Sequence, residues 1–259
     1  MTSIQSTMDQ LKQMKLYGFY DELDRQLNNA DYQQMSFMER VCLLVQQEYL
    51  AKKNKKLANR LKQADFRINA CIEDISYRAG RNLDRSQIQN LGECGFINQH
   101  QNVLITGPAG AGKTHIACAL GHRACLKGFK VKYIRFAKLF SQLSLAKEKN
   151  RVLNYFASLA KQDLIILDDW AVVNIDQKMA LDLLEIFEDR YLIRSTIVTA
   201  QFPVETWHEK IEDPTLADAI LDRFIHNSHR IEVKGKSVRK EPVKSKATSN
   251  TGNLERKHL

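Results

Sequence analysis

An eight-residue, glycine-rich segment constrains the fold of this chain more than any other feature. It matches the P-loop pattern G-x-x-x-x-G-K-[ST] with Gly107, Pro108, Ala109, Gly110, Ala111, Gly112, Lys113 and Thr114. The segment follows an apolar run at 103–106 and opens a helical stretch at 113–127, as the pattern requires. Small residues let backbone N–H groups close around phosphates, and the helix adds its positive end. We therefore predict an ATP site in which Lys113 reaches the β- and γ-phosphates and Thr114 ligates Mg²⁺.

Apolar runs and helical stretches alternate along the rest of the chain. The further runs lie at 130–135, 164–167 and 196–200, and a second helical stretch covers 177–193. Such alternation predicts an α/β fold, with a parallel sheet flanked by helices on both faces. The run at 164–167 is apolar throughout, as expected for a central strand that is covered on both sides.

Two acidic residues follow the central apolar run directly. A P-loop needs an anionic group on a neighbouring strand to organise the Mg²⁺ shell, and Asp168 fits that role. Asp169 would then orient or deprotonate the attacking water. The alternative is a strand whose end carries two ordinary loop carboxylates. The context of a P-loop some 55 residues upstream favours the catalytic interpretation.

The first 65 residues have a different character. Between residues 7 and 64 there is no proline and one glycine, and leucines recur at helical spacing, which predicts a small all-helical domain. We expect domains at 1–65 and 66–240, with a linker at the start of the second, and a basic, disordered tail at 241–259. The last helix of the first domain carries cations that are candidate DNA-phosphate contacts or simply a solvated surface: Lys52, Lys53, Lys55, Lys56 and Arg60.

The composition of the chain indicates in which compartment the protein works and what kind of partner it binds. The formal net charge of +9 favours an anionic partner, of which nucleic acid is the commonest. The 5 cysteines are odd in number and form no CxxC pair, so neither a disulfide framework nor a zinc site is indicated. No apolar run approaches the ~20 residues needed to cross a bilayer. We expect a cytoplasmic protein without a membrane partner.

Further motifs carry a resemblance to a known family. Besides the P-loop region 102–115 they are Cys71–Ile75, Arg81–Leu83, Asp168–Trp170, Thr199–Gln201, Ala219–Phe224, His229–Val233 and Gly235–Arg239. Together they resemble the IstB-like transposition helper ATPases, AAA+ proteins related to the DnaC helicase loaders and to DnaA. The resemblance covers about residues 5–240. It implies an AAA+ fold, ATP-driven homo-oligomers on double-stranded DNA, and a partner transposase.

The same resemblance implies roles for single residues. Gln201 would be the sensor near the γ-phosphate, and Arg223 would be the arginine finger that completes a neighbouring subunit's site. Arg239 is a candidate second sensor, although the lid that carries this residue in the family is shortened here. His115 belongs to the nucleotide-binding segment as a residue of the first helical turn. For Arg223 the alternative is an ordinary ion pair with Asp222 or Asp218.

Two other functions stay open at this stage. One is a DnaC-like replicative helicase loader, in which the N-terminal helices would grip a helicase. The other is a nucleotide-gated DNA scaffold in which hydrolysis is incidental. Asp169 gives the scaffold some weight, because many AAA+ proteins carry glutamate there and aspartate places its carboxylate about 1–1.5 Å further from the water.

Overall fold

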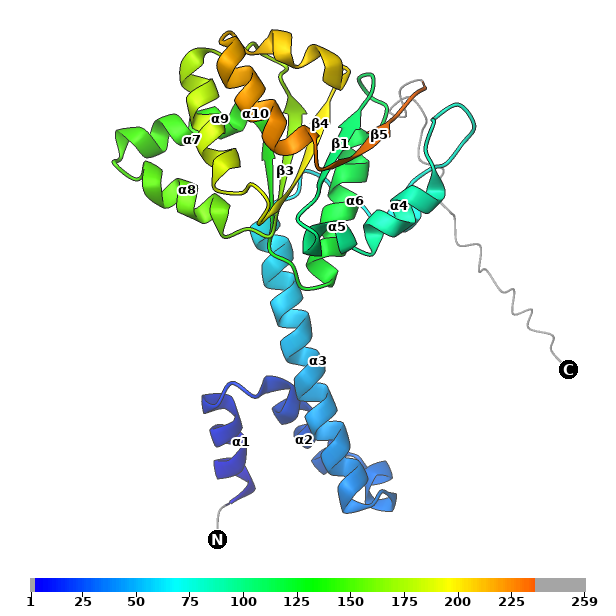
Figure 1. The fold of residues 1–259 in the computed structure, drawn as a ribbon. Helices are drawn as coiled ribbons and strands as arrows, with labels where there is room; N and C mark the ends of the chain where they lie inside the picture. Colours follow the sequence, from blue (N-terminus) through cyan, green and yellow to red (C-terminus); the bar gives the residue numbers. More distant parts are fainter. Residues whose placement is uncertain (1–2, 236–259) are drawn as a thin grey trace, which may run out of the picture.

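The core of the molecule is a five-stranded parallel sheet. The computed structural model describes residues 3–235, so Arg239 and the predicted tail lie outside the described residues. The strand order is β2-β3-β4-β1-β5, and every neighbouring pair is parallel (Figure 1). The strands are β1 (Asn102–Thr106), β2 (Val131–Arg135), β3 (Leu164–Trp170), β4 (Ser195–Ala200) and β5 (Ser228–Glu232).

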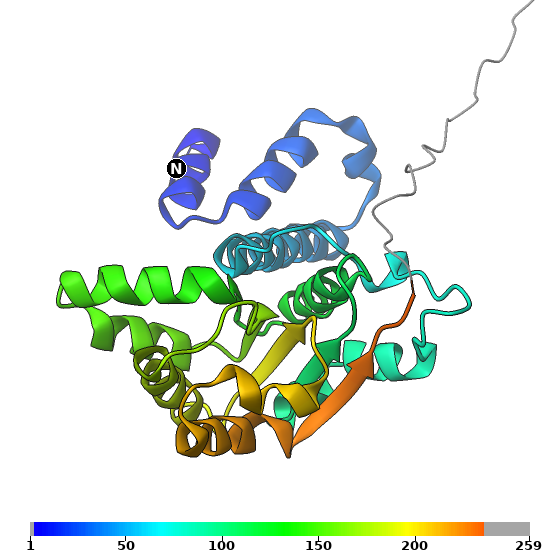
Figure 2. The same cartoon turned by 90° about the horizontal axis from the view of Figure 1, so that it is seen from above.

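Helices cover both faces of the sheet (Figure 2). On one face, α6 (Lys113–Leu126) packs with α4 (Arg85–Gly92) and α5 (Gly95–Asn98). On the other lie α7 (Phe136–Glu148), α8 (Val152–Ala160), α9 (Gln177–Glu188) and α10 (Pro214–Ile225). Short 3-10 helices cover Ala30–Gln34, Ile72–Asp74, Val204–Thr206 and His208–Lys210.

The two covered faces explain why β1, which lies inside the sheet, is apolar from Val103 to Ile105. In β1, Val103 and Ile105 enter the core beneath α6, whereas Leu104 between them enters the core beneath α7 to α10. Successive strand residues point to opposite faces, so a strand covered on both sides needs apolar residues at every position. The predicted α/β fold class is confirmed.

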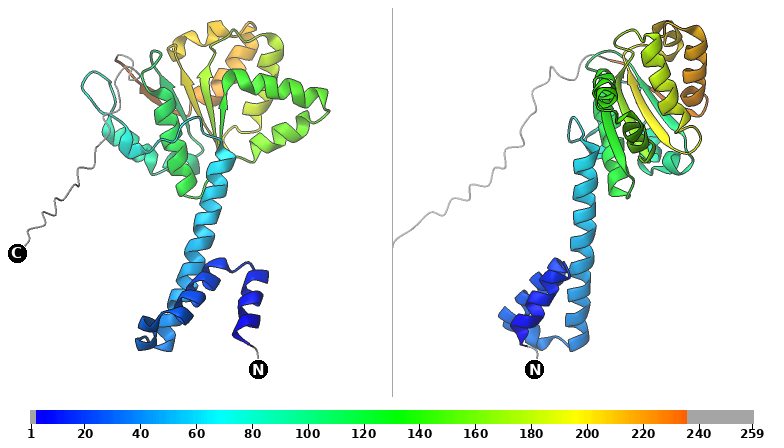
Figure 3. Two further views of the ribbon diagram at one scale, coloured as in Figure 1. Left: turned by 180° about the vertical axis from the view of Figure 1, so that it is seen from behind. Right: turned by 90° about the vertical axis from the view of Figure 1, so that its left-hand side faces the viewer.

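The N-terminal part of the structure contains the helices α1 (Ile4–Gln13), α2 (Tyr17–Asn28) and α3 (Phe37–Ala64). Helix α2 lies against α3 at Gly18, where a Cβ would stand 2.6 Å from the Gln47 carbonyl oxygen. The other end of α3 packs Leu57, Leu61 and the buried Ala64 into the core beneath α6. Helix α3 therefore joins α1 and α2 to the sheet as a single rod (Figure 3). The domain boundary near residue 66 stays a prediction.

Several elements differ from the sequence-based expectation. Strand β3 continues past Leu167 to Trp170, with an irregular register between these residues. The helix expected over 177–193 ends at Glu188, and beyond its end the buried Arg190 donates from its guanidinium to the carbonyls of Leu159 and Ser195 at 2.8 and 2.5 Å. Helices α7, α8 and α10 and strand β5 were not predicted. Within residues 3–235, no helix combines the length and apolarity needed to span a membrane.

Candidate nucleotide-binding and catalytic site

The P-loop lies at the carboxyl end of β1, as its pattern predicts. Gly107 has a φ of 145°, and a Cβ there would stand 2.1 Å from the Val233 carbonyl oxygen, so only glycine fits. Helix α6 begins at Lys113 after Gly112, whose φ is 93°, and no side chain caps it. The first N–H groups of α6 thus lack the usual side-chain acceptor, and an anion can take that place.

Lys113 is folded back over the loop that precedes it. Its side chain is almost buried, with 6% exposure, and its ammonium donates to the carbonyls of Gly107 and Pro108 at 2.8 and 3.0 Å. An ammonium has three donors and pairs strongly with phosphate oxygens. The structure therefore keeps the P-loop cation at the mouth of the anion site.

Asp168 is fully buried and is held by three hydroxyl groups. Thr114 and Thr199 donate to its Oδ1 at 2.9 and 2.6 Å, and Tyr133 donates to its Oδ2 at 2.6 Å. The carboxylate and burial together raise the pKa of Tyr133 above its ordinary value, burial being the larger cause. A threonine hydroxyl beside a carboxylate offers the oxygen ligands that Mg²⁺ prefers, so Thr114 and Asp168 fit this ion.

Asp169 occupies the irregular part of β3. Its φ of 63° lies in the left-handed region, and its backbone N–H donates to Thr199 Oγ1 at 3.0 Å. A bulge of this kind re-aims a side chain at the end of a strand. The carboxylate is 27% exposed and lines the cavity above the P-loop, whereas Asp168 points into the protein. The two acids thus occupy different environments, and the separate roles assigned to them stay a prediction.

A cavity of about 610 Å³ joins these residues, a size within the ~300–1,000 Å³ range of ligand pockets. Its walls include Ala109, Gly110, Gly112, Lys113, Thr114, His115, Asp169 and Gln201. The structure therefore brings these predicted residues together. Four cationic side chains but two carboxylates line the cavity, which favours a polyanionic ligand: Arg67, Arg81, Lys113 and Arg135 against Asp74 and Asp169.

His115 is unusual among these residues. Its Nε2 is buried and has no hydrogen-bond partner among the described residues. Burial lowers the pKa of the ring, so the neutral form is favoured. A buried polar atom without a partner at the wall of a cavity is a site where a ligand can supply the missing hydrogen bond.

Three arginines of the cavity were not identified from the sequence. Arg81 donates to the carbonyls of Ser76 and Ala111 at 2.5 and 2.6 Å, which ties the P-loop to the segment before β1. Its only sequence signal was its place in the motif 81–83. Arg67 lies 3.8 Å from both Asp168 and Asp169. Arg135 ends β2, opposite Asp168 in the register. For Arg67 and Arg135 the sequence holds no signal.

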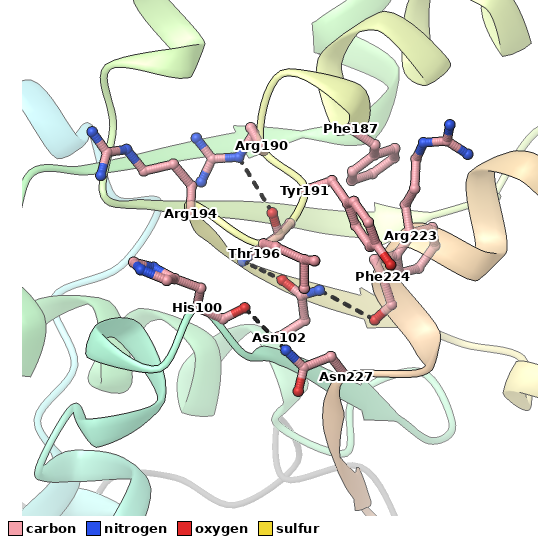
Figure 4. Close-up of a pocket in the computed structure, with 11 residues that line it drawn as sticks. His100, Asn102, Phe187, Arg190, Tyr191, Arg194, Thr196, Arg223, Phe224 and Asn227 are labelled. Atoms are coloured by element: carbon pink, nitrogen blue, oxygen red, sulfur yellow. Dashed lines mark hydrogen bonds between the residues drawn. The ribbon is translucent and has the colours of Figure 1, made fainter.

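Arg223 lies outside this cavity. Its guanidinium pairs with the Glu188 carboxylate and donates to the Ala219 carbonyl at 2.5 Å. Asp222 and Asp218, the partners considered from the sequence, pair instead with His226 and His208. Arg223 borders a small cavity of about 10 Å³ that Asn102 and Asn227 also line, and Figure 4 shows its guanidinium directed away from both. No neighbouring subunit is present to test its predicted role.

The cations of α3 have different surroundings. Lys52 pairs with Glu48 at 3.1 Å, and the Lys55 ammonium lies 5.8 Å from the centre of the Tyr17 ring. Lys53 and Lys56 are exposed. Arg60 is half-buried and donates from Nε to the Cys125 carbonyl at 3.0 Å, so it fastens α3 to α6. The four lysines remain accessible to a phosphate backbone.

Comparisons with known proteins show what this chain is similar to. A family model described as "IstB-like ATP binding protein" matches residues 9–247. A putative insertion sequence ATP-binding protein of Sinorhizobium fredii is 43% identical over 234 residues, which are 90% of this chain and 96% of that protein. The putative ATP-binding protein of insertion sequence IS1162 from Pseudomonas fluorescens is 40% identical, over 78% of this chain and 88% of that protein.

Solved structures share the fold at lower sequence identity. AMPPCP-bound DnaA from Aquifex aeolicus superposes with a TM-score of 0.56 at 18% identity, over 68% of this chain and 53% of that one. The DnaC helicase loader gives 0.55 at 16% identity, over 64% of this chain and 97% of that one. These similarities show an AAA+ fold. With the family match and the relatives' identity, they establish that the chain belongs to the IstB-like ATP-binding proteins.

Proposed function

We propose that this protein binds ATP and Mg²⁺ in the cavity above the P-loop and hydrolyses ATP to ADP and phosphate. The observation that supports this most is the meeting of Lys113, Thr114 and Asp169 in one cationic cavity, with Asp168 directly behind Thr114. Backbone N–H groups and Lys113 bind the phosphates. Asp169 accepts a proton from the attacking water, and the Gln201 amide orients that water.

Thr114 and Asp168 are the residues that would hold the metal ion. When bound, Mg²⁺ supplies positive charge to the phosphate oxygens and orients them. Tyr133 and Thr199 fix the Asp168 carboxylate from behind, at 2.6 Å each. Because both donors are hydroxyl groups and carry no charge, they orient the carboxylate and leave its negative charge for the ion.

We further propose that ATP drives assembly on double-stranded DNA, where the protein assists a partner transposase. The relatives' names, which place them in insertion sequences, and the family support this function. The exposed lysines of α3 are suited to the sequence-independent phosphate contacts that such assembly requires. Arg223 would reach the site of a neighbouring subunit, which makes hydrolysis depend on the oligomer.

Phosphate release by the full chain tests this function. With Mg²⁺, turnover should be measurable and duplex DNA should increase it. Lys113→Ala should abolish it, because the phosphate cation is lost. Arg223→Ala should bind ATP but turn over several orders of magnitude more slowly. Mixing these two variants should restore some activity at shared interfaces, and normal turnover by Arg223→Ala alone would disprove the trans arrangement.

A nucleotide-gated scaffold is the second candidate, and Asp169 is the observation that favours it. In this function ATP sets the assembly state while turnover stays negligible with and without DNA. The same phosphate measurement, combined with electron microscopy of the ATP-analogue complex on duplex DNA, separates the two. A helicase loader is distinguished by its partner, since a replicative helicase and not a transposase would co-purify with it.

A further inference from the structure

Within residues 3–235, a single side chain pairs with the carboxylate of Asp169. Among residues 3–235, Arg67 is the side chain that pairs with it, through Nη1 at 3.8 Å from Oδ2. The backbone of Asp169 is fixed separately, by the hydrogen bond from its N–H to Thr199. Within residues 3–235, Arg67 is therefore the side chain placed to influence the direction of this carboxylate, which decides whether it can reach a water in the cavity.

The backbone segment that carries Arg67 is held by contacts with α6 and β2. It follows α3 by three residues, and its neighbour Phe66 packs on α6 where a Cβ at Gly121 would stand 2.7 Å from the Phe66 ring. Lys132 of β2 holds the preceding residues, with Nζ 3.5 Å from the Asp65 carboxylate and 3.3 Å from the Gln63 carbonyl oxygen. The arginine thus extends from a fixed backbone toward the two acids, which lie 3.8 Å from the same nitrogen.

The other cations of the cavity do not have this arrangement. Arg81 is bound to two backbone carbonyls, and Lys113 to the P-loop. Arg135 lines the cavity, and among residues 3–235 it forms no ion pair with either acid. Arg67 approaches Asp168 at Oδ2, whereas the closer contact of Thr114 is with Oδ1. An ion can therefore bind beside Thr114 while Arg67 stays with Asp169.

We propose that Arg67 is a positioning residue for Asp169, holding the carboxylate toward the attacking water. The inference rests on the proposed hydrolysis. An aspartate is one methylene shorter than the glutamate that many AAA+ proteins carry here. Its carboxylate therefore comes close to the attacking water only in the right rotamer. A misplacement of about 1 Å at a reacting group costs on the order of 100-fold in rate. A guanidinium that pairs with the carboxylate reduces that misplacement.

The test is a comparison of turnover and binding in the full chain with Mg²⁺. Arg67→Ala should lower kcat about 10- to 100-fold while the Kd for a non-hydrolysable ATP analogue changes less than about twofold. Arg67→Lys should keep part of the activity, because the charge is retained without the planar fork. Arg151→Ala is the matched control, since Arg151 is an exposed arginine with no side-chain partner among the described residues, and its kcat should stay normal.

A double-mutant cycle with Asp169→Asn tests whether Arg67 affects kcat through Asp169. If Arg67 acts through Asp169, adding Arg67→Ala to Asp169→Asn should cause no further loss of kcat. If Arg67→Ala instead lowers kcat by the same factor with and without Asp169→Asn, Arg67 acts independently of Asp169 and the inference is overturned. A large rise in the analogue Kd with normal kcat would make Arg67 a phosphate ligand and would also overturn it. Thermal unfolding of each variant shows whether a loss reflects misfolding. Wild-type protein without turnover would overturn the proposed function, whereas active wild type with normal Arg67→Ala kcat overturns only this inference.

Discussion

The hydroxyl group of Tyr133 offers a direct measure of how Asp168 is held. Replacing Tyr133 with phenylalanine keeps the ring and removes one donor at 2.6 Å from a fully buried carboxylate. Thr114 and Thr199 still donate to that carboxylate, so it keeps hydrogen-bond donors after the substitution. The loss of unfolding free energy should therefore match one hydrogen bond to a charged group, about 1.5–3 kcal/mol, and not the larger cost of an unpaired buried charge.

Denaturant and thermal unfolding of Tyr133→Phe check this value. At about 2–4 °C per kcal/mol for a domain of this size, the midpoint should fall by about 3–12 °C. Tyr155→Phe is the control, because Tyr155 donates at 2.7 Å to the neutral amide of Gln142 and should lose only about 0.5–1.5 kcal/mol. Mg²⁺-dependent ATP binding should persist, since Thr114 remains. A loss at Tyr133 no larger than at Tyr155 would refute the assignment of a charged acceptor.

Three further outcomes are expected. Asp169→Asn should bind ATP normally and lose turnover in phosphate-release assays; loss of binding would mean that the two acids have exchanged roles. Neutralising the four lysines of α3 (Lys52, Lys53, Lys55 and Lys56) should flatten the slope of log DNA affinity against log salt concentration. An unchanged slope would mean that these lysines do not contact DNA phosphates and form an ordinary solvated surface. Alkylation at pH 8, followed by mass spectrometry, should label the exposed Cys42 first, because burial raises the pKa of Cys94, Cys118 and Cys125 to about 11 and keeps them as thiols. Equal labelling of all cysteines would contradict the buried environment of these three.

The P-loop and β3 could be predicted because their sequence patterns follow from local chemistry. Phosphate binding by backbone N–H groups needs small residues at fixed spacing, and Gly107 cannot carry a Cβ at all beside Val233. The central strand must be apolar on both faces. Strand β5 lacked such a signal because it is an edge strand: it pairs only with β1, and of its five residues Ile231 alone is buried.

Arg67 and Arg135 could not be predicted, and the reason is tertiary. Each is a single arginine in a polar or mixed stretch, so neither spacing nor composition marks it. Arg67 gains its proposed role from the way α3 ends against α6, about 100 residues from Asp168 along the chain. The ion pair of Arg223 could not be predicted either, because its partner Glu188 is 35 residues away on another helix and helical spacing relates only neighbours on the same helix.

The pair of Arg223 with Glu188 bears on how assembly would control hydrolysis. The Glu188 side chain is 58% exposed and that of Arg223 is 24% exposed, so solvent screens the pair on the side of Glu188, and exposed pairs contribute only about 0–1 kcal/mol. A guanidinium entering a neighbour's cavity would exchange this screened carboxylate for phosphoryl oxygens in a drier site, where charge-assisted hydrogen bonds are stronger. The exchange therefore costs little on the side of Glu188. It follows that the intramolecular pair orients Arg223 without locking it, and that the concentration of subunits on DNA, not the strength of this pair, would decide when the proposed finger acts.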